Sequence, residues 1–439
     1  MYLADSLTNL VSGLGTDKDK LAASRFGHNF VGRDELTAMY TSDWMAAQGV
    51  DTPVDDSLRA WRTWNAGQRQ TAKIVAEERR LNVRGRLSRA RKLARLHGGS
   101  IIIMGTGDPD PARPLDTAAI GQGGLQYLTV LSRWEVTTGQ LERDPLSPHY
   151  GSPSYYDLSG PAAAVRLHPS RVVRFHGVPP LESANAIDGW GTSVLNRAYD
   201  ALRNAAMAPQ NLAGLSAEAK LDIIKIAGLT QNAMDPAWRG KVLARFGLAN
   251  LGKSLNNALI LDAEESWDQK TISPNGWPEA VRLFLEIVAA AFDIPVRRLL
   301  GAAPVGLSGN GDADIRNYYD MLATQQETDL RPALAWLDEA LIRSALGSRP
   351  AGIGYSWNPL WQLNAAEQSA IALETAQAAQ IYAEMGVMPP SAMRRAVQNK
   401  LLAENTYPGL DDALKEATDI SSPLLPRVSR ETRKVKLAK

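Results

Sequence analysis

The sequence predicts a mainly helical α+β protein, and two observations carry this prediction. Long segments place apolar residues at helical spacing, whereas the apolar or alternating segments typical of strands are few and short. The composition is that of an ordinary globular protein, with 44% hydrophobic and 22% charged residues, which excludes disordered and collagen-like chains. At about 100–200 residues per domain, a chain of 439 residues is expected to hold about two to four domains.

The N-terminal half is predicted to contain three helices followed by short strands. The helices are expected over 34–45, from Asp55 or Asp56 through Trp64, and over 67–96. Gly98 and Gly99 should end the third helix, since glycine is typical of helix C-termini. The strands are expected over 100–105 and 125–136, and in a hairpin that pairs 165–167 with 171–176. A loop is expected over 107–124, and a loop or a loose hairpin over 139–161.

The C-terminal half is predicted to place a small α/β insert between two helices. A helix over 193–215 precedes the insert, and a helix over 278–292, with Pro278 at its start, follows it. The insert, 216–273, should hold strands over 221–226, 257–261 and 267–272 and a helix over 236–246. The next elements are a glycine-rich loop over 301–312, a long helix that continues to 346, a connector over 347–363, and a helical hairpin of 365–385 with 390–402 around Gly386.

Charge is unevenly distributed along the chain. The formal net charge is +1, but residues 69–95 carry +8 and residues 427–439 carry +5, so the remainder carries −12. Such blocks are usually solvated faces or tails. Separated signs also suit contact with a neighbouring copy, and the basic helix offers Arg84, Arg86 and Arg91 as a candidate inter-subunit face.

Several kinds of chemistry are excluded by composition. The chain has no cysteine, which excludes disulfides, cysteine-ligated zinc, iron–sulfur clusters and thiol nucleophiles. No apolar run approaches the ~20 residues that a membrane span needs, so no membrane partner is expected. Residues 1–20 lack the features of a signal peptide, and we expect an intracellular protein at synthesis.

The five histidines form no recognisable metal or catalytic motif. They are His28, His97, His149, His168 and His176, and none lies in a close metal-binding pattern. The segment His168-Pro169-Ser170 is similar to one half of a two-histidine phosphoesterase site. That chemistry needs a second such motif to supply both an acid and a base, and the sequence has none.

One segment matches a nucleotide-binding motif at every defined position. Residues 247–254, GLANLGKS, match the P-loop pattern literally, with Lys253 and Ser254 at its end. A working P-loop follows a buried strand and opens a helix, whereas this one follows a helical segment and precedes a predicted strand. The acidic residues Asp262, Glu264 and Glu265 fit a solvated strand edge better than a cation site. We therefore expect no catalytic, cofactor-binding or metal-binding residues and no enzyme activity, with a P-loop enzyme kept as an alternative.

Extended sequence blocks indicate a family instead. The order of helix, small α/β insert, returning helix, glycine-rich loop and long helix resembles the portal proteins of tailed bacteriophages. The segment GWGTSVL over 189–195 is similar to the opening of a portal stem helix. Residues 291–300 (AFDIPVRRLL), 301–311 (GAAPVGLSGNG) and 314–327 (DIRNYYDMLATQQE) resemble one subfamily, which has a Gly-x-Pro-x-Gly-Leu-x-x-x-Gly loop before a Tyr-Tyr-Asp helix. Residues 34–64 and 165–177 resemble its wing region.

The resemblance, which covers about 30–405, implies a portal fold with wing, stem, clip and crown regions. It assigns 1–190 to an N-terminal arm and wing, 191–215 to the first stem helix, 216–275 to the clip, 276–298 to the second stem helix, 299–346 to a tunnel loop and long wing helix, 347–422 to a crown-like region and 423–439 to a basic disordered tail. The tunnel loop implied to line the channel comprises Gly306, Leu307, Ser308, Gly309, Asn310, Gly311 and Asp312.

The resemblance also implies a function and its partners. It implies a homo-oligomeric ring of about twelve copies through which double-stranded DNA is packaged into, and ejected from, a phage capsid. The implied partners are the terminase large subunit, then a head–tail adaptor, and the major capsid or scaffold protein. The implied location is the portal vertex of the virion, with the host cytoplasm during assembly. No cofactor or catalytic residue is implied. Another structural subunit of a phage particle remains a further alternative.

Overall fold

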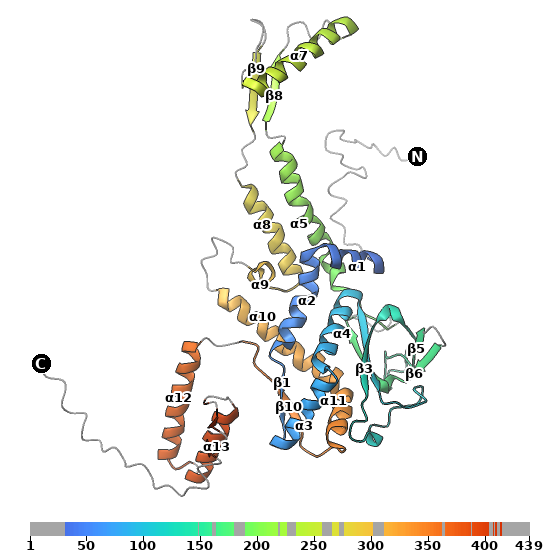
Figure 1. Ribbon diagram of the computed structural model, residues 1–439, viewed down its shortest axis with the longest axis vertical. Coiled ribbons are helices and arrows are strands. Elements are labelled where there is room, and N and C mark those ends of the chain that lie inside the picture. The colour runs from blue at the N-terminus through green and yellow to red at the C-terminus, as the bar shows by residue number, and fades with distance from the viewer. Residues whose placement is uncertain are drawn as a thin grey trace, which may run out of the picture. The chain divides into compact units, whose positions relative to one another are not determined.

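The computed structural model divides the chain into two compact units, residues 1–360 and 361–439 (Figure 1). It describes residues 31–147, 149–159, 164–179, 189–217, 220–225, 234–256, 266–271, 276–301, 311–361, 365–387, 389–403, 407, 409–410 and 413–414. Helices account for most of the described elements and the strands are short, which confirms the predicted class.

A single aspartate separates the first two helices. The predicted helix over 34–45 is divided into α1 (Arg33–Ser42) and the start of α2 (Trp44–Arg59). The Asp43 carboxylate accepts hydrogen bonds from the backbone N–H groups of Met45 and Ala46 at 2.7 and 3.0 Å. These amides have no partner within the helix, so a short acidic side chain stabilises the helix start.

The tryptophan-rich segment after α2 forms a strand, and the prediction of a helix through Trp64 is wrong. Trp61 has φ +44°, a left-handed conformation that interrupts a helix. The following β1 (Arg62–Asn65) pairs antiparallel with β10 (Gly354–Trp357), which lies in the predicted connector. The rings of Trp64 and Tyr355 contact edge-on, with centroids 5.3 Å apart. Such cross-strand aromatic pairs stabilise a two-stranded ribbon.

The basic segment forms two helices rather than one. These are α3 (Gln68–Arg80) and α4 (Val83–His97), and Asn82 between them has φ +50°. Asparagine adopts this left-handed conformation more readily than most residues, which is the reason for the break. Gly98 closes α4 with φ +87°, as the sequence predicted.

Two three-stranded antiparallel sheets follow α4, with the orders β3–β2–β7 and β4–β5–β6. Their strands are β2 (Gly99–Gly105), β3 (Tyr127–Ser132), β4 (Val136–Thr138), β5 (Tyr156–Ser159), β6 (Ala164–Leu167) and β7 (Val172–His176). The predicted hairpin is wrong, because β6 pairs with β5 whereas β7 pairs with β2 in the other sheet. The predicted strand over 125–136 is also divided, by the 3-10 turn Arg133–Glu135 between β3 and β4.

One hydrophobic core joins these elements to the long C-terminal helix of the first unit. The sheet β3–β2–β7 packs its apolar side chains against α4, and α11 (Arg331–Leu346) packs against α3 and β7. Its fully buried members include Leu87, Ile102, Leu125, Leu334 and Leu341. The uninterrupted apolar run of β2 is buried at every position, as expected for a central strand.

Two helices carry the α/β insert, as the sequence predicted. The helices α5 (Val194–Ala217) and α8 (Trp277–Ala291) contact each other along their length (Figure 1). Between them lie β8 (Lys220–Lys225), α7 (Pro236–Asn256) and β9 (Ser266–Thr271). The strand β9 pairs antiparallel with β8, whereas the sequence matched it to 257–261, which lies outside the described residues.

A nearly continuous helix follows the glycine-rich loop. The short α9 (Val296–Leu300) ends at Gly301, which has φ +69°. After residues 302–310, which lie outside the described part, α10 (Gly311–Gln325) leads through a π-helical segment (Gln326–Leu330) into α11. Pro332 lies in the first turn of α11, where its missing N–H costs little, so the helix continues through it.

The second unit contains the predicted helical hairpin. Its helices are α12 (Ala365–Glu384) and α13 (Pro390–Ala403), and Gly386 between them has φ +67°. Glycine permits this conformation at the turn. Among the described residues of both units, no helix is long and apolar enough to span a membrane.

Candidate functional site

One buried carboxylate connects the elements on both sides of the glycine-rich loop. Asp56 on α2 accepts two hydrogen bonds from Arg298 on α9, at 2.9 Å from Nε and 2.8 Å from Nη2. It also accepts one from the hydroxyl of Tyr318 on α10 at 3.2 Å. The Asp56 side chain is only 2% exposed and that of Arg298 is 45% exposed, so the bidentate contact joins a buried carboxylate to a partly exposed guanidinium. Asp56 thus fixes the chain immediately before and after residues 302–310.

The pKa values of both groups that donate to Asp56 are raised. The hydrogen bond to Asp56 raises the pKa of Arg298, which therefore stays charged. Burial, followed by the charge of Asp56, raises the pKa of Tyr318 well above its usual range, so the hydroxyl stays protonated and donates. The sequence drew attention to the RRLL and Tyr-Tyr-Asp segments, but nothing in it indicated that they share a partner, which lies 242 residues before Arg298 and 262 before Tyr318.

The end of α8 is held by a close approach to α2. The ring of Phe292 lies against Gly49, where a Cβ atom would be only 2.4 Å from the ring carbon Cζ. Phe292 is 4% exposed, and any larger residue at position 49 would have to displace its ring. Glycine is therefore required at this position for the two elements to meet.

The pair α5–α8 buries one face and exposes another that is apolar. Leu195, Ala198, Leu202 and Ala205 recur at helical spacing on α5 and are buried. On α8, the side chains of Leu283 and Ile287 are 56% and 45% exposed. They are four residues apart and lie on one face of the helix. An exposed apolar stripe on a helix of this length is typical of a surface that another chain covers.

The predicted loop residues are only partly within the described chain. Gly306, Leu307, Ser308, Gly309 and Asn310 lie outside it. Gly311 and Asp312, which the sequence places in the loop, are the first residues of α10. The loop is therefore shorter at its C-terminal end than predicted.

The predicted basic face is not a single surface. Arg84 is exposed, and its Nη2 donates to the backbone carbonyl of Arg59 at 2.8 Å. Arg91 instead lines a pocket together with Arg95, Phe292 and other residues. Arg86 is half-buried on another side of α4. Their role between subunits stays a prediction.

The segment that matches the P-loop motif lies inside a helix. All eight residues 247–254 belong to α7, including Lys253 and Ser254. A P-loop binds phosphate through backbone N–H groups that a loop leaves free, whereas those of a helix interior are bonded to carbonyl groups one turn earlier. This geometry argues against nucleotide binding at the motif.

His168 caps the turn between the two sheets. Its Nδ1 lies 2.8 Å from the Oγ of Ser170 and accepts a hydrogen bond from the Ser170 backbone N–H at 3.2 Å. Burial, and then the charge of Arg171, lowers the pKa of His168. The contact closes a turn, which is a structural role. The described residues contain no cluster of acidic and histidine side chains that would hold a metal ion.

Sequence reasoning missed a buried ion network beneath the β1–β10 ribbon. The guanidinium of Arg62 forms ion pairs with Glu78 at 2.9 Å and Asp338 at 2.7 Å. Burial raises the pKa of Asp338, although Arg62 opposes this effect. The same guanidinium lies over the ring of Trp64 at 4.5 Å. The network fixes β1 to α3 and α11. Its only signal in the sequence is Arg62, an arginine placed between two tryptophans.

Comparison with known proteins identifies the family of this fold. A family model described as phage portal protein matches residues 34–381, which is most of the chain and includes α5, the insert, α8 and α10. The chain belongs to the phage portal protein family. The resemblance stated from the sequence blocks is therefore confirmed.

Relatives of this portal-family chain extend over nearly its whole length. A protein of Caulobacter sp. (strain RHG1) is 44% identical over 95% of the chain and 69% of the relative. A protein of Sphingomonas paeninsulae is 38% identical over 95% of the chain and 68% of the relative. Both carry the name anti-CBASS protein Acb1, and close to a third of each lies beyond the match.

Solved structures share the portal fold of this chain. A chain in the neck of an empty gene transfer agent particle matches with a TM-score of 0.52 and 18% identity, over 85% of this chain and 96% of that one. At this identity the match shows the fold alone. It confirms the mainly helical α+β architecture reached from the sequence.

Proposed function

We propose that the chain is the portal vertex subunit of a phage or phage-like particle. About twelve copies form a ring around a channel for double-stranded DNA during packaging and ejection. In this proposal α5 and α8 form the stem and the β8–α7–β9 insert forms the clip. The clip docks the terminase large subunit and then a head–tail adaptor, while the outer part meets capsid or scaffold protein. The ring assembles in the host cytoplasm and becomes part of the virion at its portal vertex.

The observation that carries this proposal is the family match together with the order of elements it spans. The match covers the two packed helices, the insert between them and the anchored loop that follows. The exposed apolar stripe of Leu283 and Ile287 adds independent support, because a ring would cover it with a neighbouring copy. A ring requires head-to-tail contacts that close on themselves.

Negative-stain electron microscopy of the purified full chain tests the proposal. We expect closed rings with an axial hole wide enough for a DNA duplex. The variant Leu283→Asp/Ile287→Asp should shift the protein to monomers, because charges would be buried at the contact. Leu146→Asp is the matched control, since Leu146 is 91% exposed on a wing loop and should leave the rings intact. Monomers in the wild-type protein, or open filaments, would contradict the ring.

The name of the two bacterial relatives raises a second candidate, an anti-CBASS function. The portal family model accounts for most of the region that this chain shares with those relatives, and close to a third of each relative lies beyond it. We infer that the portal-like part lacks this function, which would then belong to the third of those relatives outside the match. The purified chain should fail to antagonise CBASS in an assay where a full-length Acb1-named relative succeeds. Equal activity of the two proteins would overturn this inference.

A further inference from the structure

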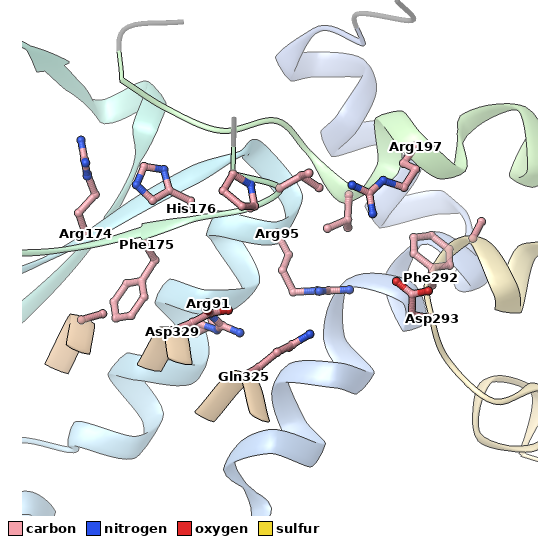
Figure 2. A pocket seen from close by; sticks show the side chains of 16 residues that line it. Arg91, Arg95, Arg174, Phe175, His176, Arg197, Phe292, Asp293, Gln325 and Asp329 are labelled. Atoms are coloured by element: carbon pink, nitrogen blue, oxygen red, sulfur yellow. The ribbon is translucent and has the colours of Figure 1, made fainter. Parts of the chain in front are cut away.

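A pocket of about 420 Å³ lies where five elements of the first unit meet (Figure 2). Its wall is formed by α4, the end of β7, the start of α5, the end of α8 and the helix around the π segment. Its size lies within the range of small-molecule sites. Nothing in the portal function described above uses it.

The charged groups of the pocket are mostly arginines. They are Arg91, Arg95, Arg174 and Arg197, against Asp293 and Asp329. The four positive and two negative charges give the lining a formal net charge of +2. His176 adds none at neutral pH, because burial, and then the charge of Arg174, lowers its pKa to about 4. The pocket is thus a partly enclosed cationic site.

Two of these arginines repel each other. Arg91 and Arg95 are one helical turn apart on α4, and Figure 2 shows both guanidinium groups facing the middle of the pocket with the side chain of Gln325. Burial, and then the positive charge of Arg91, lowers the pKa of Arg95 to about 10. Like charges placed together away from water are costly unless an anion accompanies them.

The protein supplies little of that compensation. Arg95 donates to the backbone carbonyls of Val50 and Gly49 at 3.1 and 2.7 Å, which carry no net charge. The Nε atom of Arg91 is buried without a hydrogen-bond partner. Asp329 attracts Arg91, but within the part of the chain that the structure describes no ion pair joins them. The pocket therefore has more hydrogen-bond donors than acceptors to receive them, and more positive than negative charge.

We propose that this pocket binds a phosphate group, either as the free ion or carried by a small organic molecule. A phosphate dianion matches the net charge of +2, and guanidinium groups bind its oxygens through paired hydrogen bonds. The guanidinium groups of Arg91 and Arg95 and the Gln325 amide offer more donors than the two oxygens of a carboxylate would use. Gln325 ends α10 and Asp329 lies in the π segment, a distortion often found at binding sites.

Calorimetry and thermal unfolding of the purified full chain test the proposal directly. Inorganic phosphate, adenosine monophosphate, succinate and chloride are compared at pH 7.5 and equal ionic strength. We expect phosphate and adenosine monophosphate to bind with one site per chain and to raise Tm, and chloride and succinate to do neither. Tighter binding of the nucleotide would assign the pocket to a phosphate-bearing small molecule, and equal binding to the free ion.

Charge-matched variants locate the site. Arg91→Gln should weaken phosphate binding by about tenfold or more. Its stability in phosphate-free buffer should not fall, because the repulsion with Arg95 is removed. Arg89→Gln makes the same change of net charge at an exposed position of the same helix and should bind like wild type. Arg197→Gln, at an exposed position on α5, provides a second test should Arg91→Gln fold poorly.

Three outcomes would overturn the proposal. Phosphate that acts no differently from chloride would exclude a specific site. Equal binding of succinate would indicate a carboxylate side chain, such as one from a second copy, as the occupant. An equal loss of phosphate affinity in Arg89→Gln and Arg91→Gln would show that only the net charge of the protein matters, and not this pocket. Because no arm of the experiment depends on ring formation, its failure would leave the portal proposal untouched.

Discussion

At the scale of single residues, Asp56 organises more structure than any residue that the sequence singled out. It is buried on α2 and accepts hydrogen bonds from Arg298 and Tyr318, which lie on different elements. Neither partner is within helical reach of Asp56, so no periodicity could reveal the contact. The sequence treated Asp56 only as a candidate helix cap, and capping explains nothing of its burial.

Removing this carboxylate should destabilise the protein. Asp56→Ala leaves the charged donor and the buried hydroxyl without their acceptor, and we expect a loss of about 2–3 kcal/mol in the free energy of unfolding. Urea denaturation followed by circular dichroism measures it. Asp55→Ala is the control: its side chain is 54% exposed and pairs with Lys92 at the surface, so a change below about 1 kcal/mol is expected. Similar losses in both variants would contradict the anchoring role.

A half-buried histidine should make stability depend on pH. The pKa of His176 is about 4 in the folded protein because of burial and then the nearby Arg174, below its usual value of about 6.5 in an unfolded chain. Its neutral form thus contributes stability that is fully present above pH ~6.5. This contribution is lost as the pH falls toward 4, because the unfolded chain takes up the proton first.

The comparison of His176→Gln with wild type isolates this effect from that of the carboxylates. The free energy of unfolding of wild type should fall by about 2 kcal/mol more than that of the variant between pH 7 and pH 4.5. Chemical denaturation at each pH gives both curves. Parallel curves would show that His176 is protonated equally well in the folded protein.

At the scale of elements, the sequence predicted the helices and strands whose hydrophobic pattern extends over many consecutive residues. The helices α5, α8, α12 and α13 were predicted from apolar residues at helical spacing, and the strand β2 was predicted from its continuous apolar run. The errors fall where one residue changes the backbone. Trp61 and Asn82 adopt left-handed conformations, and each ended a helix that periodicity would have continued.

Pairing between distant strands was the other source of error. The strand β7 pairs with β2 rather than with its neighbour β6, and β1 pairs with β10 across most of the first unit. A hairpin needs only a turn, whereas these pairings are set by packing on a shared core. The sequence located the insert between α5 and α8 but neither Asp56 nor the arginine pocket, and most of its predicted loop lies outside the described residues.

The insert should be separable from the rest of the fold. Lys225 and Ser266 are paired at one end of the β8–β9 ribbon, so a two-glycine link can replace residues 226–265. The Tm of this variant should stay close to that of wild type, because the described residues of the main core include none from the insert. If the insert is the clip, binding to the terminase large subunit should be lost in a pull-down. Undiminished binding would remove the docking role from the insert.

At the scale of the whole molecule, a near-zero net charge conceals a basic segment on an acidic body. The structure divides that segment between α3 and α4 and spreads its arginines over several sides. Arg91 lines the pocket, which leaves Arg84 and Arg86, on different sides of α4, as two separate candidate contacts. If these two residues meet acidic groups of the next copy, Arg84→Glu/Arg86→Glu should prevent ring formation at low salt. Size-exclusion chromatography with light scattering measures the assembly.

The control for this variant reverses the same charge elsewhere. Arg113→Glu/Arg143→Glu lies at exposed loop positions away from α4 and should assemble as wild type does. The effect should weaken as salt is raised, since the Debye length shortens from about 10 Å at 0.1 M to about 3 Å at 1 M. Normal rings from Arg84→Glu/Arg86→Glu at low salt would rule out the basic contact.

The shared anchor at Asp56 has a mechanical consequence. Because Arg298 and Tyr318 hold the chain on both sides of residues 302–310 to one carboxylate, a pull on that segment is transmitted to α2 at a single point. The load then enters the main core through α2 and α4, which contact each other, instead of peeling α9 away from α10. A force applied to the chain from either side of residues 302–310 is therefore borne by the same carboxylate and by the main core to which α2 belongs.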